Sequence, residues 1–241
     1  GIPEDATVIG HVGRLAPEKN LDYLAEAVGR YLHDRLQAVF LVVGSGDASE
    51  SMQRILRDYS NAKQAVFAGK QTGQDLADAY AAMDVFAFSS QSETQGMVLA
   101  EAMAAGVPAV ALDAPGAREI VSKRNGMLLD ASVSAQEFAE AIAAVADDRA
   151  RRKKMSEGAK KTAAEFSLQQ CADRMLALYE RLAPDRSAQR EWDVDPWDRL
   201  LGRLEIEWNL LVEKTSALAA AATIETEATR SAAQTASQPT S

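Results

Sequence analysis

The sequence predicts an α/β fold with a doubly wound, Rossmann-like parallel sheet that is followed by carboxy-terminal helices. Two observations lead to this prediction. Short apolar runs alternate with helix-length segments from residue 7 to residue 129, as is typical of βαβ units with right-handed crossovers. The run at 38–43 is apolar at every position, which suits a strand buried on both faces of a parallel sheet.

Periodicity and the residues at each end define the individual elements. Apolar residues at helical spacing, among them Leu21, Leu24 and Val28, predict the first helix. Strands are expected at 7–13, 38–43, 65–68, 84–88, 108–112 and 126–129. Helices are expected between them at 18–33, 49–58, 74–82 and 96–105, with a short one at 117–121. Beyond residue 130 three helices are expected at 134–146, 148–165 and 168–182, with Ser134 and Ser167 as N-caps.

The chain divides into four predicted parts. Residues 1–183 are the Rossmann-like domain with its terminal helices, and 184–195 are a polar linker. An amphipathic helix is expected at 196–222, because its apolar residues fall on one stripe. Residues 223–241 are of low complexity and are expected to be disordered. The apolar stripe suits contact with the rest of an enzyme, with another protein or with a membrane, and its mixed charge disfavours the membrane.

Composition excludes several functional classes. The net charge of −9 over 241 residues disfavours a nucleic-acid partner, which needs a basic face, and docking onto anionic lipid through charge alone. A single cysteine, Cys171, forms no intramolecular disulfide, and with only two histidines no zinc site can be built from soft ligands. No signal peptide is visible and no apolar run reaches the ~20 residues of a spanning helix. A cytoplasmic location is expected, with a peripheral position at the inner face of the membrane as the alternative.

Ligands of doubly wound sheets bind beyond the carboxyl ends of the strands, so the loops that follow the strands are the candidate site. The first loop places Arg14 and Lys19 near a helix start, and Gly13 gives a ligand room to approach. Two cations there suit a diphosphate, although a surface arginine and lysine flanking a turn explain this loop equally well. The second loop, 44–47, is an incomplete dinucleotide fingerprint that disfavours an NAD-dependent dehydrogenase.

The segment at 90–108 is the most informative part of the chain. Glu93 lies in a loop, Gly96 opens a helix, and Glu101 lies about one turn inside it. Amides at the helix start point toward an anion, while carboxylates accept hydrogen bonds from sugar hydroxyls. By itself the pattern also suits an ordinary helix with acidic residues near its first turn.

In its context this segment closely resembles the E-x7-E signature of retaining, nucleotide-sugar-dependent glycosyltransferases of the GT-B fold, family 4 (group 1). Further matches in the family's order and spacing lie at 10–20, 42–46, 66–69, 82–86 and 116–121. The resemblance covers residues 1–182 and identifies the chain as the carboxy-terminal, donor-binding half of such an enzyme.

The resemblance implies a role for each matched residue. Arg14, Lys19 and Glu93 are the implied catalytic group, in which the two cations stabilise the departing nucleotide diphosphate and the carboxylate contacts the sugar. Glu101 is expected to hold the ribose. The other implied donor-binding residues are Gly13, Gly44, Gly69, Lys70, Gln71, Thr94, Gln95, Gly96, Met97 and Val98. The implied donor is a UDP- or GDP-hexose, with no metal or other cofactor, and the acceptor is a lipid or another sugar.

The family's amino-terminal acceptor domain has no match in this chain, so it is expected as a missing partner, and the fragment is expected to bind donor without turnover. His11 is expected to pack within the first strand rather than take part in catalysis, and Cys171 to lie in the core. Two alternatives stay open: a non-catalytic nucleotide-binding or interaction module, and a GT-B enzyme that isomerises or hydrolyses a nucleotide sugar.

Overall fold

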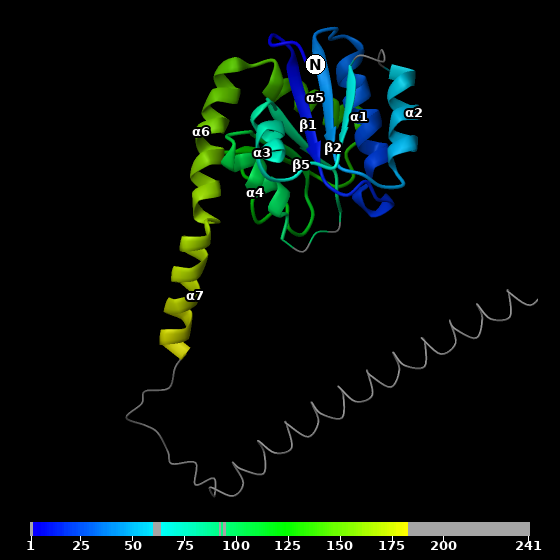
Figure 1. Ribbon diagram of the computed structural model, residues 1–241. Helices are drawn as coiled ribbons and strands as arrows, with labels where there is room; N and C mark the ends of the chain where they lie inside the picture. Colours follow the sequence, from blue (N-terminus) through cyan, green and yellow to red (C-terminus); the bar gives the residue numbers. More distant parts are fainter. Residues whose placement is uncertain (1, 60–63, 92, 94, 183–241) are drawn as a thin grey trace, which may run out of the picture. The chain divides into compact units, whose positions relative to one another are not determined.

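A six-stranded parallel sheet forms the centre of the protein (Figure 1). The computed structural model describes residues 2–59, 64–91, 93 and 95–182. The strands are β1 (Thr7–Val12), β2 (Ala38–Val43), β3 (Ala65–Gly69), β4 (Val85–Phe88), β5 (Ala109–Leu112) and β6 (Gly126–Leu129). Their order is β3-β2-β1-β4-β5-β6 and every pairing is parallel. The predicted doubly wound fold is therefore confirmed, and the direction of winding reverses between β1 and β4.

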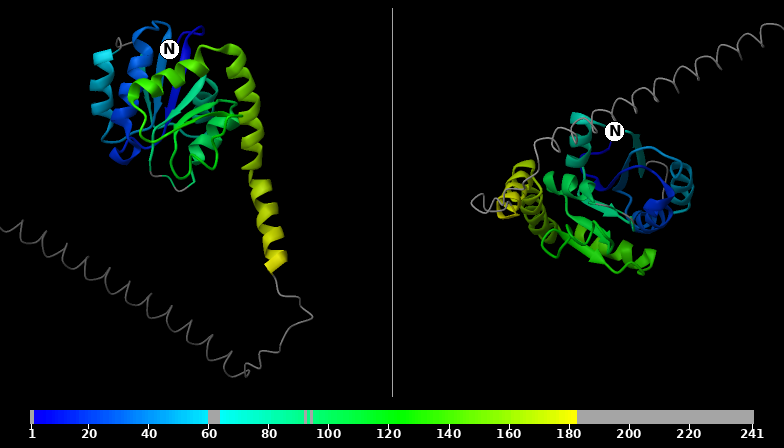
Figure 2. Two further views of the ribbon diagram at one scale, coloured as in Figure 1. Left: turned by 180° about the vertical axis from the view of Figure 1, so that it is seen from behind. Right: turned by 90° about the horizontal axis from the view of Figure 1, so that it is seen from below.

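Helices cover both faces of the sheet (Figure 2). They are α1 (Leu21–His33), α2 (Ser49–Tyr59), α3 (Gly73–Ala81), α4 (Met97–Ala104), α5 (Ala135–Ala146), α6 (Arg149–Glu165) and α7 (Leu168–Leu182). Helices α1, α2 and α5 bury their apolar residues on one face, and α3, α4 and α6 on the other. Successive β1 residues alternate accordingly, with Ile9 in the first core and Val8 in the second, as the pleat of a strand requires.

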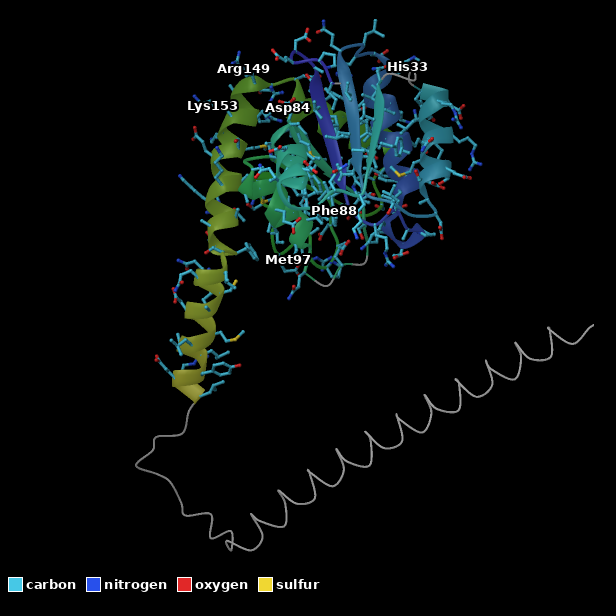
Figure 3. All side chains as sticks on the ribbon, viewed as in Figure 1. His33, Asp84, Phe88, Met97, Arg149 and Lys153 are labelled. Atoms are coloured by element: carbon cyan, nitrogen blue, oxygen red, sulfur yellow. The ribbon has the colours of Figure 1, made fainter. Side chains whose placement is uncertain are left out.

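All six strands point the same way, so their carboxyl ends share one edge of the sheet. Figure 3 shows Phe88, the last residue of β4, on the side of the sheet that also carries Met97, away from Asp84 and His33. The loops after β1, β2, β3 and β4 therefore meet at this edge.

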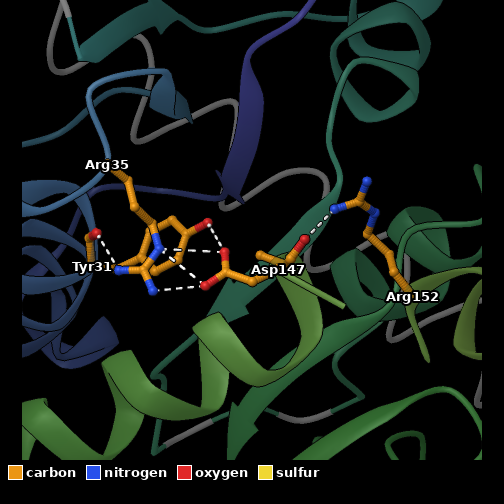
Figure 4. Close-up of polar contacts among 5 residues, drawn as sticks. Tyr31, Arg35, Asp147 and Arg152 are labelled. Carbon is orange, nitrogen blue, oxygen red and sulfur yellow. Dashed lines mark hydrogen bonds and ion pairs between the residues drawn. The ribbon is translucent and has the colours of Figure 1, made fainter. Parts of the chain in front are cut away.

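An aspartate fastens α1 to the junction between α5 and α6 (Figure 4). Arg35 Nη2 lies 2.7 Å from Oδ2 of Asp147, and the Tyr31 hydroxyl donates to Oδ1 at 3.1 Å. Nearby, Arg152 of α6 lies 3.4 Å from Asp84, the residue that precedes β4. These polar contacts fix the helices at the end of the sheet opposite the edge where the loops after β1 to β4 meet.

Two expected helices differ from the structure. The helix expected at 18–33 is divided into a short 3-10 helix, Pro17–Lys19, and α1, because Asn20 between them adopts a left-handed conformation with φ 55°. Asparagine tolerates this region better than most residues. The short helix expected at 117–121 is a series of turns, in which Val121 donates to the Ala117 carbonyl at 2.8 Å. One such turn cannot nucleate a stable helix.

The predictions for the carboxy-terminal helices are partly confirmed. Ser134 caps α5 in a capping box with Glu137, and the Ser167 hydroxyl accepts from the Gln170 amide at 3.3 Å. Cys171 is exposed, so its expected place in the core is wrong; α7 buries none of its residues. No helix in the described ranges is long and apolar enough to cross a bilayer.

Residues 1–177 form one compact unit and residues 178–241 a second. The predicted linker at 184–195, amphipathic helix at 196–222 and tail at 223–241 lie outside the described residues and stay predictions.

We expect Phe138→Ala to lower the free energy of unfolding by about 3–5 kcal/mol, because a fully buried aromatic ring leaves a cavity. Phe138 lies on α5 and meets the Tyr23 ring of α1 edge to face, with centroids 5.8 Å apart. Leu36→Ala is the control, since that side chain is 80% exposed. Urea unfolding of both variants measures the difference, and equal losses would contradict the packing described here.

Candidate functional site

A cavity of about 310 Å³ lies where β1 and β4 end, at the point where the strand order reverses. Its walls come from the end of β1, the loop that follows it, and the segment that leads from β4 into α4. The lining residues are His11, Val12, Gly13, Arg14, Lys19, Phe88, Glu93, Gln95, Gly96, Met97 and Val98. Met97 marks this edge in Figure 3. Most of the predicted site residues are thus brought together here.

An ion pair crosses this cavity. Lys19 Nζ lies 2.6 Å from Oε1 of Glu93, and both side chains are largely buried, with 18% and 19% exposed. The Ser89 hydroxyl, just after β4, contacts the backbone carbonyls of Lys19 and Asn20 at 3.0 and 3.1 Å. The turn that carries the lysine is therefore held against the end of β4. Nothing in residue spacing alone predicts this contact, since 74 positions separate the two charges.

Arg14 lines the same cavity but is held less firmly. Its guanidinium pairs with Glu18 of the short 3-10 helix at 2.5 Å, and 72% of its side chain is exposed. An exposed pair of this kind contributes little to stability. Arg14 can therefore exchange Glu18 for a ligand at small cost.

The start of α4 supplies backbone donors. Gly96 is the N-cap of the helix, with φ 61°, and because it has no side chain it makes no side-chain cap hydrogen bond to the first turn. A Cβ at Gly96 would lie 2.7 Å from the Gly116 carbonyl oxygen, so only glycine fits this approach. Uncapped amides at a helix N-terminus attract anions. Together with Lys19 and Arg14, they favour negative charge in the cavity.

A second cavity, of about 390 Å³, continues from the first along the ends of β2 and β3. Val12, Gly13 and Arg14 line both cavities. The second is completed by Val43, Gly44, Ser45, Lys70, Gln71 and Leu76. Gly69, predicted with this group, accepts at its carbonyl from the Gly44 amide at 2.8 Å and is not among the lining residues.

Glu101 occupies a third cavity, of about 530 Å³, between α3 and α4. Leu76 lines both this cavity and the second one. The Tyr80 hydroxyl donates to Oε2 of Glu101 at 2.7 Å, and burial together with this hydrogen bond raises the pKa of Tyr80. Glu101 thus lines a different cavity from the Lys19–Glu93 pair. Thr94 lies outside the described residues.

His11 is the residue whose place in the site was missed. It is only 2% exposed, as expected for a packed residue, yet it lines the first cavity. Its Nδ1 lies 3.1 Å from the Ala87 carbonyl oxygen, which makes Nδ1 the protonated nitrogen, and Nε2 has no hydrogen-bond partner within the described structure. Desolvation lowers the pKa of His11 to about 4. The sequence feature that could have placed His11 in the site is its position at the end of a strand, two residues before Gly13.

No group of three or more histidine, cysteine, aspartate or glutamate side chains suited to a metal ion occurs within the described ranges.

Burial of neutral His11 makes stability depend on pH. The unfolded chain takes up a proton as the pH falls through 6.5, whereas folded His11 stays neutral down to about pH 4. Its contribution is complete above pH 6.5 and declines as the pH drops, so the free energy of unfolding loses about 2 kcal/mol between pH 7 and pH 5. Urea titrations at both pH values test this. In His11→Gln the loss between the two pH values should shrink by that amount, and an unchanged loss would contradict it.

Comparison with known proteins places this architecture in a family. Residues 1–162 match the family described as "Glycosyl transferases group 1". A GDP-mannose-dependent alpha-mannosyltransferase of Mycolicibacterium smegmatis is 43% identical over 129 residues, which are 53% of this chain and 32% of that protein. The chain spans less than half of the length of the first curated relatives that it matches, 32% of one and 46% of the other.

Solved structures agree with this placement. HepE of Anabaena in complex with UDP-glucose is 27% identical with a TM-score of 0.63, and the match covers 72% of this chain and 49% of HepE. The C-terminal domain of the group 1 glycosyltransferase LpcC of Francisella tularensis has the same fold, with a TM-score of 0.60 at 22% identity over 67% of this chain and 87% of that domain. The sheet has the fold of the carboxy-terminal domain of GT-B enzymes, and the chain belongs to the glycosyl transferases group 1 family.

Proposed function

We propose that this domain binds a UDP- or GDP-linked hexose and that the complete enzyme transfers the hexose to an acceptor with retention of configuration. The observation that carries the proposal is the cavity between β1 and β4, where Lys19, Arg14 and the uncapped start of α4 surround one space with Glu93. Cations and amides suit the diphosphate, and the carboxylate suits sugar hydroxyls.

The diphosphate is the leaving group of the proposed reaction. When the bond between the anomeric carbon and its oxygen breaks, negative charge builds up on the diphosphate. Lys19, held beside that position by Glu93, and Arg14, which can leave Glu18 for the ligand, stabilise the charge as it develops. Glu93 keeps the Lys19 ammonium in place through the 2.6 Å contact at Oε1 and would accept a sugar hydroxyl at Oε2.

The nucleoside is proposed to extend through the two further cavities. Lys70 and Gln71 border the second cavity, where the base would lie, and the Gln71 amide is held by the Ala68 carbonyl at 2.7 Å. Glu101 would accept the ribose hydroxyls, with its carboxylate oriented by Tyr80 at 2.7 Å. Because the ribose links the base to the diphosphate, its site must adjoin both of theirs; the first and second cavities share Val12, Gly13 and Arg14, and the second and third share Leu76.

The acceptor and the partner domain are also part of the proposal. The acceptor, a lipid or another sugar, would bind mainly to an amino-terminal domain of the same enzyme. Helix α7 has exposed apolar side chains suited to contact with that domain, at Leu168, Met175, Leu176, Leu178, Tyr179 and Leu182. The Mycolicibacterium relative makes GDP-mannose the first donor to test, and the HepE complex makes UDP-glucose the second.

Calorimetric titration with GDP-mannose and UDP-glucose tests the diphosphate site. Lys19→Ala and Arg14→Ala should each weaken the bound donor by about 10- to 100-fold, the effect of one lost charge-assisted hydrogen bond. Lys153→Ala is the matched control, because that lysine lies on α6 and lines none of the three cavities (Figure 3). Equal affinity in all three variants would remove the assignment.

Glu101→Gln separates the ribose site from the diphosphate site. The amide retains an acceptor for Tyr80 but removes the charge, so we expect about tenfold weaker binding of whichever sugar nucleotide binds the wild-type domain. Binding of inorganic pyrophosphate should not change, since Glu101 lines a different cavity from Lys19. An equal loss of pyrophosphate affinity would show that Glu101 supports the folded structure rather than binding the ribose.

A further inference from the structure

A buried nitrogen in the diphosphate cavity has no hydrogen-bond partner. His11 Nε2 is the one buried side-chain nitrogen or oxygen within the described residues for which none is found. Leaving such an atom unsatisfied is destabilising, so its retention requires an explanation. The rest of the ring is well fixed, since it stacks on Phe86 with centroids 6.2 Å apart and a 12° interplanar angle.

The unpartnered nitrogen faces the space that Gly13 leaves open. A Cβ built on Gly13 would lie 3.6 Å from Nε2, and within the described structure no other heavy atom beyond the chain neighbours comes within 4 Å of that Cβ. Gly13 and His11 both line the first cavity. An atom of a ligand can therefore enter the place of the missing side chain and meet Nε2.

The hydrogen bond at Nδ1 determines whether Nε2 is a hydrogen-bond donor or an acceptor. Nδ1 donates to the Ala87 carbonyl, so neutral His11 presents a lone pair at Nε2. A protonated ring would present a donor instead. The charged groups that face His11 are Lys19 of the 3-10 helix and Glu93 of the loop before α4, and these two compensate one another at 2.6 Å. Arg14 and the amides of α4 then favour an anion, whose oxygens have no proton to donate.

We propose that His11 takes up one proton from solvent when a diphosphate oxygen of the donor enters the cavity, and that Nε2–H then donates to that oxygen while Nδ1–H stays on Ala87. The inference rests on the proposed function and assigns the leaving group a third cationic contact. The proton returns to solvent when the nucleotide departs. The Nε2–H bond formed and broken with this proton is the one covalent change at the imidazole.

Before a ligand binds, the surroundings of His11 keep its ring neutral. Burial keeps His11 neutral by lowering its pKa to about 4; the Ala87 carbonyl and Glu93 oppose this effect, and Lys19 adds to it. An anion next to the ring favours the charged form. Because the bound state then holds a proton that the free state lacks, donor affinity must rise as the pH falls.

Calorimetry with GDP-mannose and UDP-glucose measures this linkage, because the diphosphate diester of a sugar nucleotide does not titrate near neutral pH. Titrations at pH 6, 7 and 8 in pairs of buffers with different ionisation enthalpies give the protons taken up. We expect net uptake that grows toward one proton at pH 6, and affinity about fivefold higher at pH 6 than at pH 8. His11→Gln should abolish both effects.

Gly13→Ala is a second variant that leaves His11 in place. The added methyl group would meet Nε2 at 3.6 Å, an ordinary contact, and fill the space meant for the ligand oxygen. We expect this variant to fold, to bind the donor more weakly and to take up no proton. The same pH dependence in wild type, His11→Gln and Gly13→Ala would overturn the proposal.

Nitrogen-15 NMR of the imidazoles gives a readout that does not depend on the variants' stability. His33 is the only other histidine of the chain, so His33→Gln assigns the signals. With a saturating sugar nucleotide at pH 6, we expect the His11 signals of an imidazolium. A bound ligand with neutral His11, including one that donates a sugar hydroxyl to Nε2, overturns this inference alone. Failure of GDP-mannose and UDP-glucose to bind overturns it together with the proposed function.

Discussion

The pairing of β1 with β4 is the constraint on which the site depends. These strands lie side by side in parallel, with Ile9 opposite Val85 and Gly10 opposite Phe86. The helices that follow them pack on opposite faces of the sheet, α1 on one and α4 on the other. The two loops therefore diverge and leave a crevice between them, as at every point where a doubly wound sheet reverses. The cavity of Lys19 and Glu93 occupies that crevice.

Charge in this crevice is balanced within a few ångströms. Each cation has a carboxylate neighbour, Glu93 for Lys19 and Glu18 for Arg14, at 2.6 and 2.5 Å. The two pairs differ in burial, since the Lys19 pair is largely enclosed and the Arg14 pair is open to solvent. A buried pair is costly to break, whereas an exposed one exchanges readily. The lysine thus belongs to the permanent structure, and the arginine is free to respond to a ligand.

Much of the fold could be predicted from the sequence because its signals are local. Unbroken apolar strands and amphipathic helices have recognisable periods, and Ser134 marks a helix start through its own hydrogen bonds. Cys171 was misplaced because helical spacing among apolar neighbours predicts a buried face only when another element covers it. The left-handed Asn20, which ends the 3-10 helix, was hidden inside a continuous helical pattern.

The site could be predicted only in part for a related reason. The sequence distance between Glu93 and Glu101 is fixed, but the cavity that each lines depends on how α3 packs beside α4, which brings Tyr80 to Glu101. The unpartnered nitrogen of His11 depends on the Ala87 carbonyl of another strand and on an empty volume beside Gly13. Neither of these spatial relations can be recognised from the order of residues along the chain.

The loops after β1 and β2 touch through their backbones. A Cβ on Gly44 would lie 1.8 Å from the Gly13 carbonyl oxygen, and the Gly13 amide donates to the Val43 carbonyl at 3.0 Å. Neither loop can be displaced without carrying the other along. Under the proposed function this linkage couples the cavity proposed for the base to the one proposed for the diphosphate, so a mismatched base would displace the loop that carries Arg14.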